Sequence, residues 1–304
     1  MRRKFVRVIF FSLITLLAIG ILGCSTNMKT EGKDTYSSNK VPSSEKRVLR
    51  VGLVPNQAPD KMKAKYEPFK KYLSEKLGVE IELFVASNYA GVVEAIANDK
   101  LDMAYFGGLT YVQAKKRAAI HPIVTDVDSE TKTTKYYSLI ITPADSQIKQ
   151  ITDLKGKTFA FGDVSSTSGS LYPRFMLDKA GLKVPDDFAN VIYTGKHDAT
   201  ALAVENGKVD AGGLEGRILN KLIQEGKIDS TKIRILAKSA PIEGYPWVVA
   251  DKLDKELEKK IVEAFLNMND IDLLELMKAE RFEKVTADDY KYIAEQALRL
   301  GLLK

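Results

Sequence analysis

The sequence predicts an α/β protein built from two similar lobes. Apolar, β-branched runs alternate with stretches of helical periodicity between residues 47 and 300, which is typical of parallel sheets with helices on both faces. A short block of sequence recurs 108 residues further along the chain, which indicates a repeated unit. Both copies lead into a short strand that ends in glycine, and open α/β sheets bind ligands beyond the carboxyl ends of their strands. We therefore expect two lobes that face each other across a cleft.

The N-terminus has the features of an export signal. Four basic residues precede an apolar run from Val8 to Leu22, which ends at Gly23-Cys24. The run falls short of the roughly 18 to 20 apolar residues that span a bilayer. We therefore expect residues 1–23 to be removed as a signal peptide.

The residues around the expected cleavage point indicate a lipid anchor. Ile21-Leu22-Gly23-Cys24 resembles the bacterial lipobox, in which the cysteine is joined to diacylglycerol. Cys24 is the only cysteine of the chain, so an internal disulfide and a cysteine-based metal site are both excluded. We expect a lipid on Cys24 that holds the protein on the extracytoplasmic side of the cell membrane. A plain signal peptide, or an anchor helix that happens to contain a cysteine, remains the alternative.

The segment after the signal peptide predicts a flexible tether. Residues 24–46 are rich in Ser, Thr, Asn, Lys and Gly and have no apolar periodicity. A folded body then begins near Arg47, and it is long enough for one large domain or two small ones. Removal of the leader, with its four basic residues, lowers the formal charge from +6 to +2. So small a net charge gives no indication of nucleic-acid binding, and we expect none.

Nine short runs rich in apolar and β-branched residues predict strands. They are Val48–Val54, Glu80–Val85, Met103–Phe106, His121–Val127, Tyr137–Thr142, Thr158–Phe161, Asn190–Tyr193, Ile233–Ala237 and Trp247–Ala250.

Helical periodicity appears between these runs. The clearest case is Lys61–Leu77, where Met62, Tyr66, Phe69 and Tyr72 recur on one helical face. Similar spacing predicts helices over Gly91–Ala97, Leu109–Ala119, Ala199–Val204, Leu219–Gln224, Leu257–Met268, Asp272–Met277 and Asp288–Leu300.

The recurring block supports the division into lobes. Asn98-Asp99-Lys100-Leu101-Asp102, followed by Gly107-Gly108, is matched by Asn206-Gly207-Lys208-Val209-Asp210, followed by Gly212-Gly213. Each block follows a helix rich in Ala and Val. Because turns of the Asn-Gly-Lys type are common, chance similarity remains the alternative.

A hydroxyl-rich turn follows the strand that ends at Phe161. Its sequence, Ser165-Ser166-Thr167-Ser168-Gly169-Ser170, leads into a helical pattern through Phe175, Met176 and Ala180. Hydroxyls beside the unpaired N–H groups at the start of a helix form a site for an anion. The turn contains no lysine, so it is not a Walker A loop, and its hydroxyls can also serve only as a helix cap. Pro173 is expected a turn or more inside this helix, where it would cost a hydrogen bond.

His197 lies in a second segment of interest. Gly195-Lys196-His197-Asp198-Ala199 follows a predicted strand and opens a helix, with Asp198 as the expected cap. A neutral imidazole at this position can donate one hydrogen bond to an oxyanion. A structural role for His197 remains the alternative.

Several motifs together closely resemble the phosphonate/phosphite/phosphate-binding proteins of ABC importers. In chain order they are Val51-Gly52-Leu53-Val54-Pro55, Tyr66-Glu67-Pro68-Phe69, Asn88-Tyr89-Ala90-Gly91-Val92-Val93-Glu94-Ala95, Ser166-Thr167-Ser168-Gly169 and His197-Asp198-Ala199. The resemblance covers roughly residues 47–249. It implies a type II periplasmic-binding fold, in which two lobes joined by a two-strand hinge close on one ligand. Residues 47–142 and 240–304 would form the first lobe and residues 143–239 the second.

The resemblance also implies the residues that bind the ligand. In the family, the Ser-Thr-Ser turn and the histidine hold the phosphoryl oxygens, two tyrosines line the pocket, and an acidic residue follows the second repeat block. The corresponding positions here are Tyr89, Tyr137, Ser166, Thr167, Ser168, His197 and Glu215. Tyr245 is a further residue that we expect to bind the ligand.

Tyr245 marks a departure from the family pattern. Many relatives have an aspartate directly before the Pro-Trp pair, where this chain has Tyr245. A carboxylate there would suit an ammonium group on the ligand. We therefore expect methylphosphonate, phosphite or phosphate to bind more tightly than an amine-bearing phosphonate, unless Glu243 swings in to replace the missing carboxylate.

The implied partners are a small phosphorus oxyanion, an ABC permease with its ATPase, and the membrane through the lipid on Cys24. We further expect a monomer without a cofactor. An enzyme on the same fold is disfavoured because the folded part has no cysteine, no histidines at metal-ligand spacing and a single plausible base without an evident orienting partner. A surface sensor or adhesin that presents the bound ligand remains the alternative.

Overall fold

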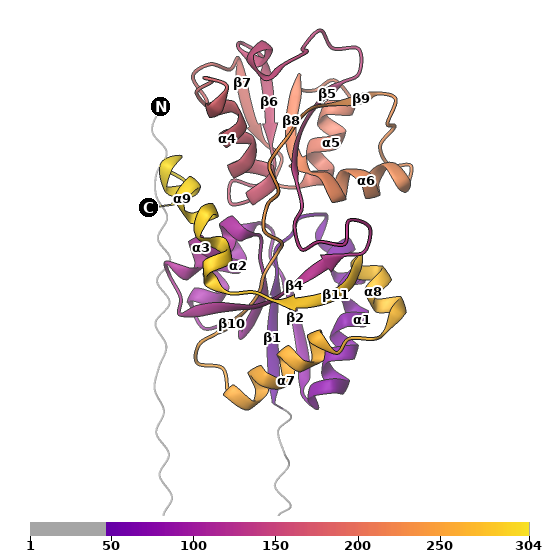
Figure 1. Ribbon diagram of the computed structural model, residues 1–304, viewed down its shortest axis with the longest axis vertical. Coiled ribbons are helices and arrows are strands. Elements are labelled where there is room, and N and C mark those ends of the chain that lie inside the picture. Colours follow the sequence, from indigo (N-terminus) through magenta and orange to yellow (C-terminus); the bar gives the residue numbers. More distant parts are fainter. Residues whose placement is uncertain (1–46, 304) are drawn as a thin grey trace, which may run out of the picture. The chain divides into compact units, whose positions relative to one another are not determined.

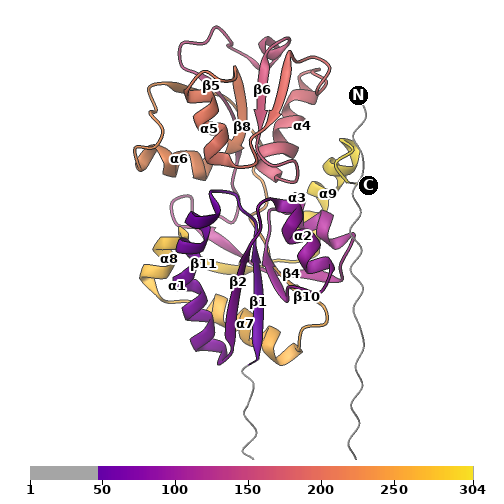
Figure 2. The same cartoon turned by 180° about the vertical axis from the view of Figure 1, so that it is seen from behind.

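The computed structural model describes residues 47–303, which contain two β-sheets with helices packed against them (Figures 1 and 2). The expected signal peptide, the expected lipid site at Cys24 and the expected tether lie outside the described residues. Within residues 47–303, no helix combines the length and the apolar character needed to cross a bilayer.

The first lobe is the six-stranded sheet with its helices. Its strands are β1 (Val48–Leu53), β2 (Glu80–Val85), β3 (Met103–Tyr105), β4 (Ile120–Asp128), β10 (Trp247–Ala250) and β11 (Ala279–Lys284), in the spatial order β11-β4-β10-β3-β1-β2. Its helices are α1 (Pro59–Leu77), α2 (Tyr89–Ala97), α3 (Gly108–Lys115), α7 (Lys255–Leu266), α8 (Ile271–Met277) and α9 (Lys291–Arg299), with the 3-10 turn η3 (Ala287–Tyr290).

The second lobe is the five-stranded sheet with its helices. Its strands are β5 (Ser138–Pro143), β6 (Thr158–Phe161), β7 (Asn190–Tyr193), β8 (Ala211–Glu215) and β9 (Ile233–Lys238), in the spatial order β7-β6-β8-β5-β9. Its helical segments are α4 (Tyr172–Lys179), α5 (His197–Glu205), α6 (Gly216–Gln224), the 3-10 turn η1 (Ile151–Leu154) and the π-type turn η2 (Thr167–Leu171).

The expected strands and helices are all present, with bounds that differ by a few residues. The apolar face predicted for α1 is buried as expected, with Phe69 packed against Trp247 and Phe265 in the core of the first lobe. Strand β11 was not expected. It lies at the edge of its sheet and buries only Ala279 and Phe282, so its sequence lacks the apolar character of the inner strands.

The expectation of parallel sheets is wrong in part, because both sheets are mixed. β1 runs parallel to β2 and β3, and β6 runs parallel to β7 and β8. β10 is antiparallel to β3 and β4, and β5 is antiparallel to β8 and β9. Each of these two strands begins just after the chain has crossed from the other lobe, so it runs away from the crossing while its neighbours run toward it.

Two chain segments join the lobes, and they pair with each other. The N–H of Tyr136 donates to the carbonyl of Ile242 at 3.0 Å, and the N–H of Ile242 donates to the carbonyl of Tyr136 at 2.8 Å. Because β5 belongs to the five-stranded sheet, the boundary expected at residue 142 lies before Ser138.

The sequence placed Pro173 a turn or more inside a helix, and this expectation is wrong. The hydroxyl-rich segment forms η2, and α4 begins only at Tyr172, so Pro173 lies in its first turn, where proline is tolerated. A Cβ atom on Gly213 would lie 2.4 Å from the Pro173 ring. A glycine of the second repeat block therefore makes room for this proline.

Candidate functional site

The hydroxyl-rich turn is folded tightly against the end of β6. The hydroxyl of Ser166 accepts the N–H of Gly169 at 3.0 Å, so Ser166 is a cap as the sequence allowed. The N–H of Gly162 donates to the carbonyl of Gly169 at 2.8 Å. A Cβ on Gly169 would lie 2.9 Å from the Ser166 hydroxyl and 3.0 Å from Cε1 of His197. Gly169 therefore allows this turn and His197 to approach each other.

His197 begins α5 and is fully buried. Its Nδ1 accepts the backbone N–H of Glu215 at 3.2 Å, so the proton of the neutral ring is on Nε2. Burial lowers the pKa of His197, against the opposing effect of Glu215 and Asp198, and the ring is neutral at pH 7. Asp198 is not the cap that the sequence indicated, because Lys196 occupies that position and Asp198 lies in the first turn.

Buried polar atoms without a partner gather at this turn. Among residues 47–303, the Ser168 hydroxyl, the Tyr136 hydroxyl and Nε2 of His197 are buried and make no hydrogen bond. Tyr136 lies beside Thr167 and Ser168, and Tyr89 lies beside Ser166. A buried donor without a partner costs about 1 to 3 kcal/mol. Such a group of donors is suited to surround an oxyanion, which would supply the missing acceptors.

Tyr137 lies outside this group, whereas its neighbour Tyr136 belongs to it. The Tyr137 ring is half-buried and faces the ammonium of Lys238 at 3.6 Å. Tyr136 is buried, with its ring 5.4 Å from that of Tyr245. Successive side chains of an extended segment point to opposite sides, so Tyr136 and Tyr137 face different surroundings.

The first lobe contributes directly to the turn. The N–H of Leu109, at the start of α3, donates to the Thr167 hydroxyl at 2.9 Å, and Thr110 donates to the Ser165 carbonyl at 2.9 Å. Because the Thr167 oxygen accepts from Leu109, its own proton is available to a ligand. The lobes are thus in contact at the hydroxyl-rich turn.

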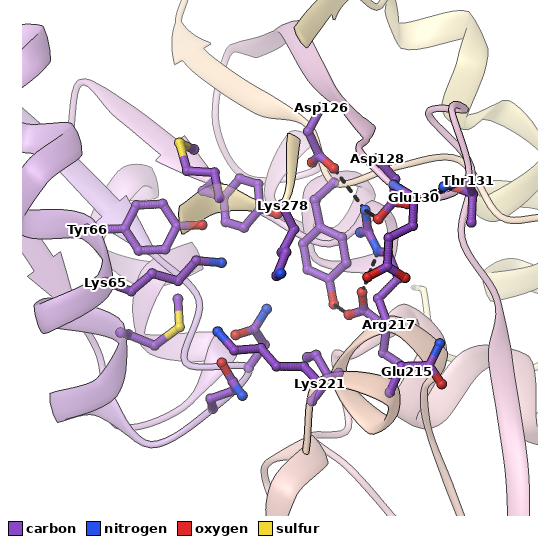
Figure 3. A pocket seen from close by; sticks show the side chains of 18 of the residues that line it. Lys65, Tyr66, Asp126, Asp128, Glu130, Thr131, Glu215, Arg217, Lys221 and Lys278 are labelled. Atoms are coloured by element: carbon purple, nitrogen blue, oxygen red, sulfur yellow. Dashed lines mark hydrogen bonds and ion pairs between the residues drawn. The ribbon is translucent and has the colours of Figure 1, made fainter. Parts of the chain in front are cut away.

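Glu215 lies at the other end of the site, and both its oxygens are engaged. The hydroxyl of Tyr245 donates to one oxygen at 2.8 Å, and Nε of Arg217 donates to the other at 2.9 Å (Figure 3). Arg217 also reaches the first lobe, where it donates to Asp126 at 2.8 Å. Burial opposes its charge, but the carboxylates of Asp126 and Glu215 raise the pKa of Arg217 well above its usual value. Sequence reasoning missed both Arg217 and Asp126, although Arg217 follows Glu215 by two residues.

Tyr245 is held firmly in this position. Its ring stacks on Tyr105 with centroids 5.2 Å apart and an interplanar angle of 22°. Glu243 does not replace the missing carboxylate, because it pairs with Lys135 and accepts from Thr134 in the other crossing segment. The structure therefore places Tyr89, Ser166, Thr167, Ser168 and His197 together, with Glu215 and Tyr245 next to them. Residues 47–303 contain no group of three His, Cys, Asp or Glu side chains placed to hold a metal ion.

Comparison with known proteins gives one consistent result. Residues 51–290 match the family model described as ABC transporter, phosphonate, periplasmic substrate-binding protein. A probable ABC transporter phosphite binding protein of Prochlorococcus marinus is 28% identical over 275 residues, which are 86% of this chain and 92% of that protein. The phosphonates-binding periplasmic protein of Escherichia coli is 30% identical over 227 residues, which are 73% of this chain and 67% of that protein.

The fold agrees with these sequence matches. The structure of a Prochlorococcus marinus protein, PhnD1, in complex with methylphosphonate is similar with a TM-score of 0.77 and 26% identity. The similarity covers 84% of this chain and 98% of that one.

Proposed function

This chain belongs to the phosphonate family of ABC transporter periplasmic substrate-binding proteins, and on that premise we propose that it captures a small phosphorus oxyanion between its lobes. It then delivers the ion to an ABC permease and its ATPase. The observation that carries this proposal is the group of unpaired buried donors formed by Tyr136, Ser168 and His197. A relative binds methylphosphonate in the same fold, and another is described as a phosphite binding protein.

The site supports binding rather than catalysis. A general base must present an unprotonated atom toward the reacting group. Because Nδ1 of His197 accepts from the backbone of Glu215, the nitrogen that faces the donor group is the protonated Nε2. His197 therefore donates a hydrogen bond to the oxyanion.

The other end of the site favours a ligand without an ammonium group. Each oxygen of Glu215 already accepts a hydrogen bond, one from Tyr245 and one from Arg217, and the charge of Arg217 repels a cation. We expect phosphite, methylphosphonate or phosphate to bind more tightly than aminoethylphosphonate.

A calorimetric titration with these four ligands tests both statements. Failure to bind any of them would refute the function. Tightest binding of aminoethylphosphonate would refute the role of Tyr245 while leaving the function intact. The variant Tyr245→Asp provides the matched comparison, and it should shift the order toward aminoethylphosphonate because the second carboxylate can pair with the ammonium.

The same proposal includes an anchor outside the cytoplasm. Members of this family act in the periplasm, and the Cys24 motif supports attachment of this chain to the outer face of the membrane by a lipid. The tether of residues 24–46 would then let the folded body reach the permease.

A further inference from the structure

A cavity of about 110 Å³ lies between the lobes beside the Tyr245–Glu215 pair. Tyr245, Glu215 and Arg217 form part of its wall, whereas Thr167 and His197 do not. The remaining lining comes from both lobes, chiefly from α1 and β4 of the first and α6 of the second. This cavity therefore shares Glu215 and Tyr245 with the far end of the site but does not include the group of donors described above.

Three lysines converge on the cavity, which we call the lysine cavity. Lys65 comes from α1, Lys221 from α6 and Lys278 from the end of α8, and Figure 3 shows their side chains pointing toward one another. All three are half-buried. Within residues 47–303, Lys65 and Lys278 have no carboxylate within 4 Å. In the same part of the chain, the one carboxylate within 4 Å of Lys221 is that of Glu225, the C-cap residue of α6, at 3.7 Å.

Three of the four acidic residues of the lining already have partners within the lining itself. Arg217 binds Asp126 and Glu215. Asp128 accepts the backbone N–H groups of Glu130 and Thr131 at 3.0 and 2.7 Å. Glu130 is the remaining acid, and its side chain is exposed. The three ammonium groups therefore share the cavity with four carboxylates, of which that of Glu130 alone makes no hydrogen bond or ion pair among the described residues.

Contact between the lobes brings these positive charges together. The pKa of Lys65 is lowered to about 8, mainly by burial and secondly by the positive charge of Lys221. Lys65 and Lys221 belong to different lobes, so their repulsion acts against closure. An anion between them would offset this repulsion and provide the acceptors that the ammonium groups lack.

We propose that the lysine cavity is a second anion site, which binds a small divalent oxyanion through Lys65, Lys221 and Lys278. Its ligand is recognised by charge and by hydrogen bonds to oxygen. Because the three lysines come from both lobes, occupation of the site stabilises the closed arrangement.

Sulfate is the probe for this proposal, since it carries two charges at neutral pH. We would follow the backbone amide signals of Asn220 and Lys278 by NMR while sulfate is added to the wild-type protein. The same titration on Thr167→Ala excludes binding at the hydroxyl-rich turn. The double variant Lys65→Gln/Lys278→Gln removes two of the three charges. Lys63→Gln, an exposed lysine of α1 outside the cavity, is the matched control.

The expected result is a saturable shift that persists in Thr167→Ala and Lys63→Gln and weakens at least tenfold in the double variant. The proposal is overturned if wild-type protein shows no saturable shift. It is equally overturned if the shift is lost in Thr167→Ala but retained in the double variant. Neither outcome depends on whether the protein also binds a phosphorus compound, so the proposed function is tested separately.

Discussion

His197 shows how one backbone contact determines the chemistry of a side chain. Its Nδ1 accepts from the N–H of Glu215, which leaves the proton on Nε2 among the unpaired donors. Burial lowers the pKa of the ring and keeps it neutral. The site therefore offers an anion a directed hydrogen bond from His197 without adding a positive charge.

The first prediction concerns this hydrogen bond. His197→Ala should weaken oxyanion binding by more than tenfold, because a hydrogen bond to a charged group contributes about 1.5 to 3 kcal/mol. His197→Gln should retain more affinity than His197→Asn, since the longer amide can place a donor near the position of Nε2. Calorimetry measures the affinities, and thermal melts verify that the variants fold. Unchanged affinity in folded His197→Ala would contradict this role.

The second prediction uses neighbouring tyrosines as a matched pair. Tyr136→Phe removes a buried hydroxyl beside Thr167 and Ser168 and should weaken oxyanion binding severalfold. Tyr137→Phe removes a hydroxyl outside the group of donors and should leave the affinity unchanged. The reverse pattern, measured in the same titrations, would restore the assignment that the sequence indicated.

The choice between Tyr136 and Tyr137 could not be made from the sequence. Tyr137, Leu139 and Ile141 share one side of an extended segment, and Tyr136, Ser138 and Ile140 share the other. Both sides of this segment are largely buried, so its residues do not alternate between polar and apolar. The sequence therefore did not show which side faces the site. Arg217 and Asp126 were missed for another reason: they are 91 residues apart and meet only where the lobes are in contact.

At the scale of elements, the site is assembled by the ends of strands and the starts of helices. The end of β6 positions the hydroxyl-rich turn, the start of α5 positions His197, and the start of α3 reaches Thr167 from the first lobe. The sequence predicted most of this arrangement because glycines and hydroxyls mark such junctions. It did not predict β11, because this edge strand is rich in charged residues and lacks the apolar pattern of a strand. It also did not predict that the strand after each crossing is antiparallel to its neighbours.

The third prediction belongs to the junction between α3 and the turn. Thr167→Val keeps the shape of the side chain but removes both the acceptor for Leu109 and the donor for a ligand. We expect it to weaken oxyanion binding by more than tenfold, whereas Thr167→Ser should retain most of the affinity. Equal titration curves for Thr167→Val and the wild-type protein would exclude a role for the hydroxyl.

At the scale of the whole molecule, two crossing segments, polar contacts at the cleft and the packing of Leu171 and Tyr172 against the first-lobe core hold the lobes together. The cleft contacts include Leu109 with Thr167, Arg217 with Asp126, and Lys61 with Asp198 at 3.5 Å. Relative motion is the usual behaviour of two parts joined in this way, unless the interface between them is large and hydrophobic. Tyr136 and Ile242 in the crossing segments can serve as the hinge.

The fourth prediction concerns the anchor. Cys24→Ser should abolish lipid addition and leave an unprocessed precursor, while the folded body still binds its ligand. Two acyl chains suffice as an anchor because each buried CH2 contributes roughly 0.8 kcal/mol. Metabolic labelling with a radioactive fatty acid measures the attachment, and normal labelling of Cys24→Ser would disprove the assignment of the lipid site.

The fifth prediction tests the central claim, which is that an oxyanion is captured by closure of the two lobes. Small-angle X-ray scattering should show a smaller radius of gyration when the tightest-binding oxyanion is added at saturation, because its binding free energy favours the closed arrangement. His197→Ala, at a ligand concentration that saturates only the wild-type protein, should show a smaller change. An unchanged radius of gyration in fully liganded wild-type protein would contradict the account.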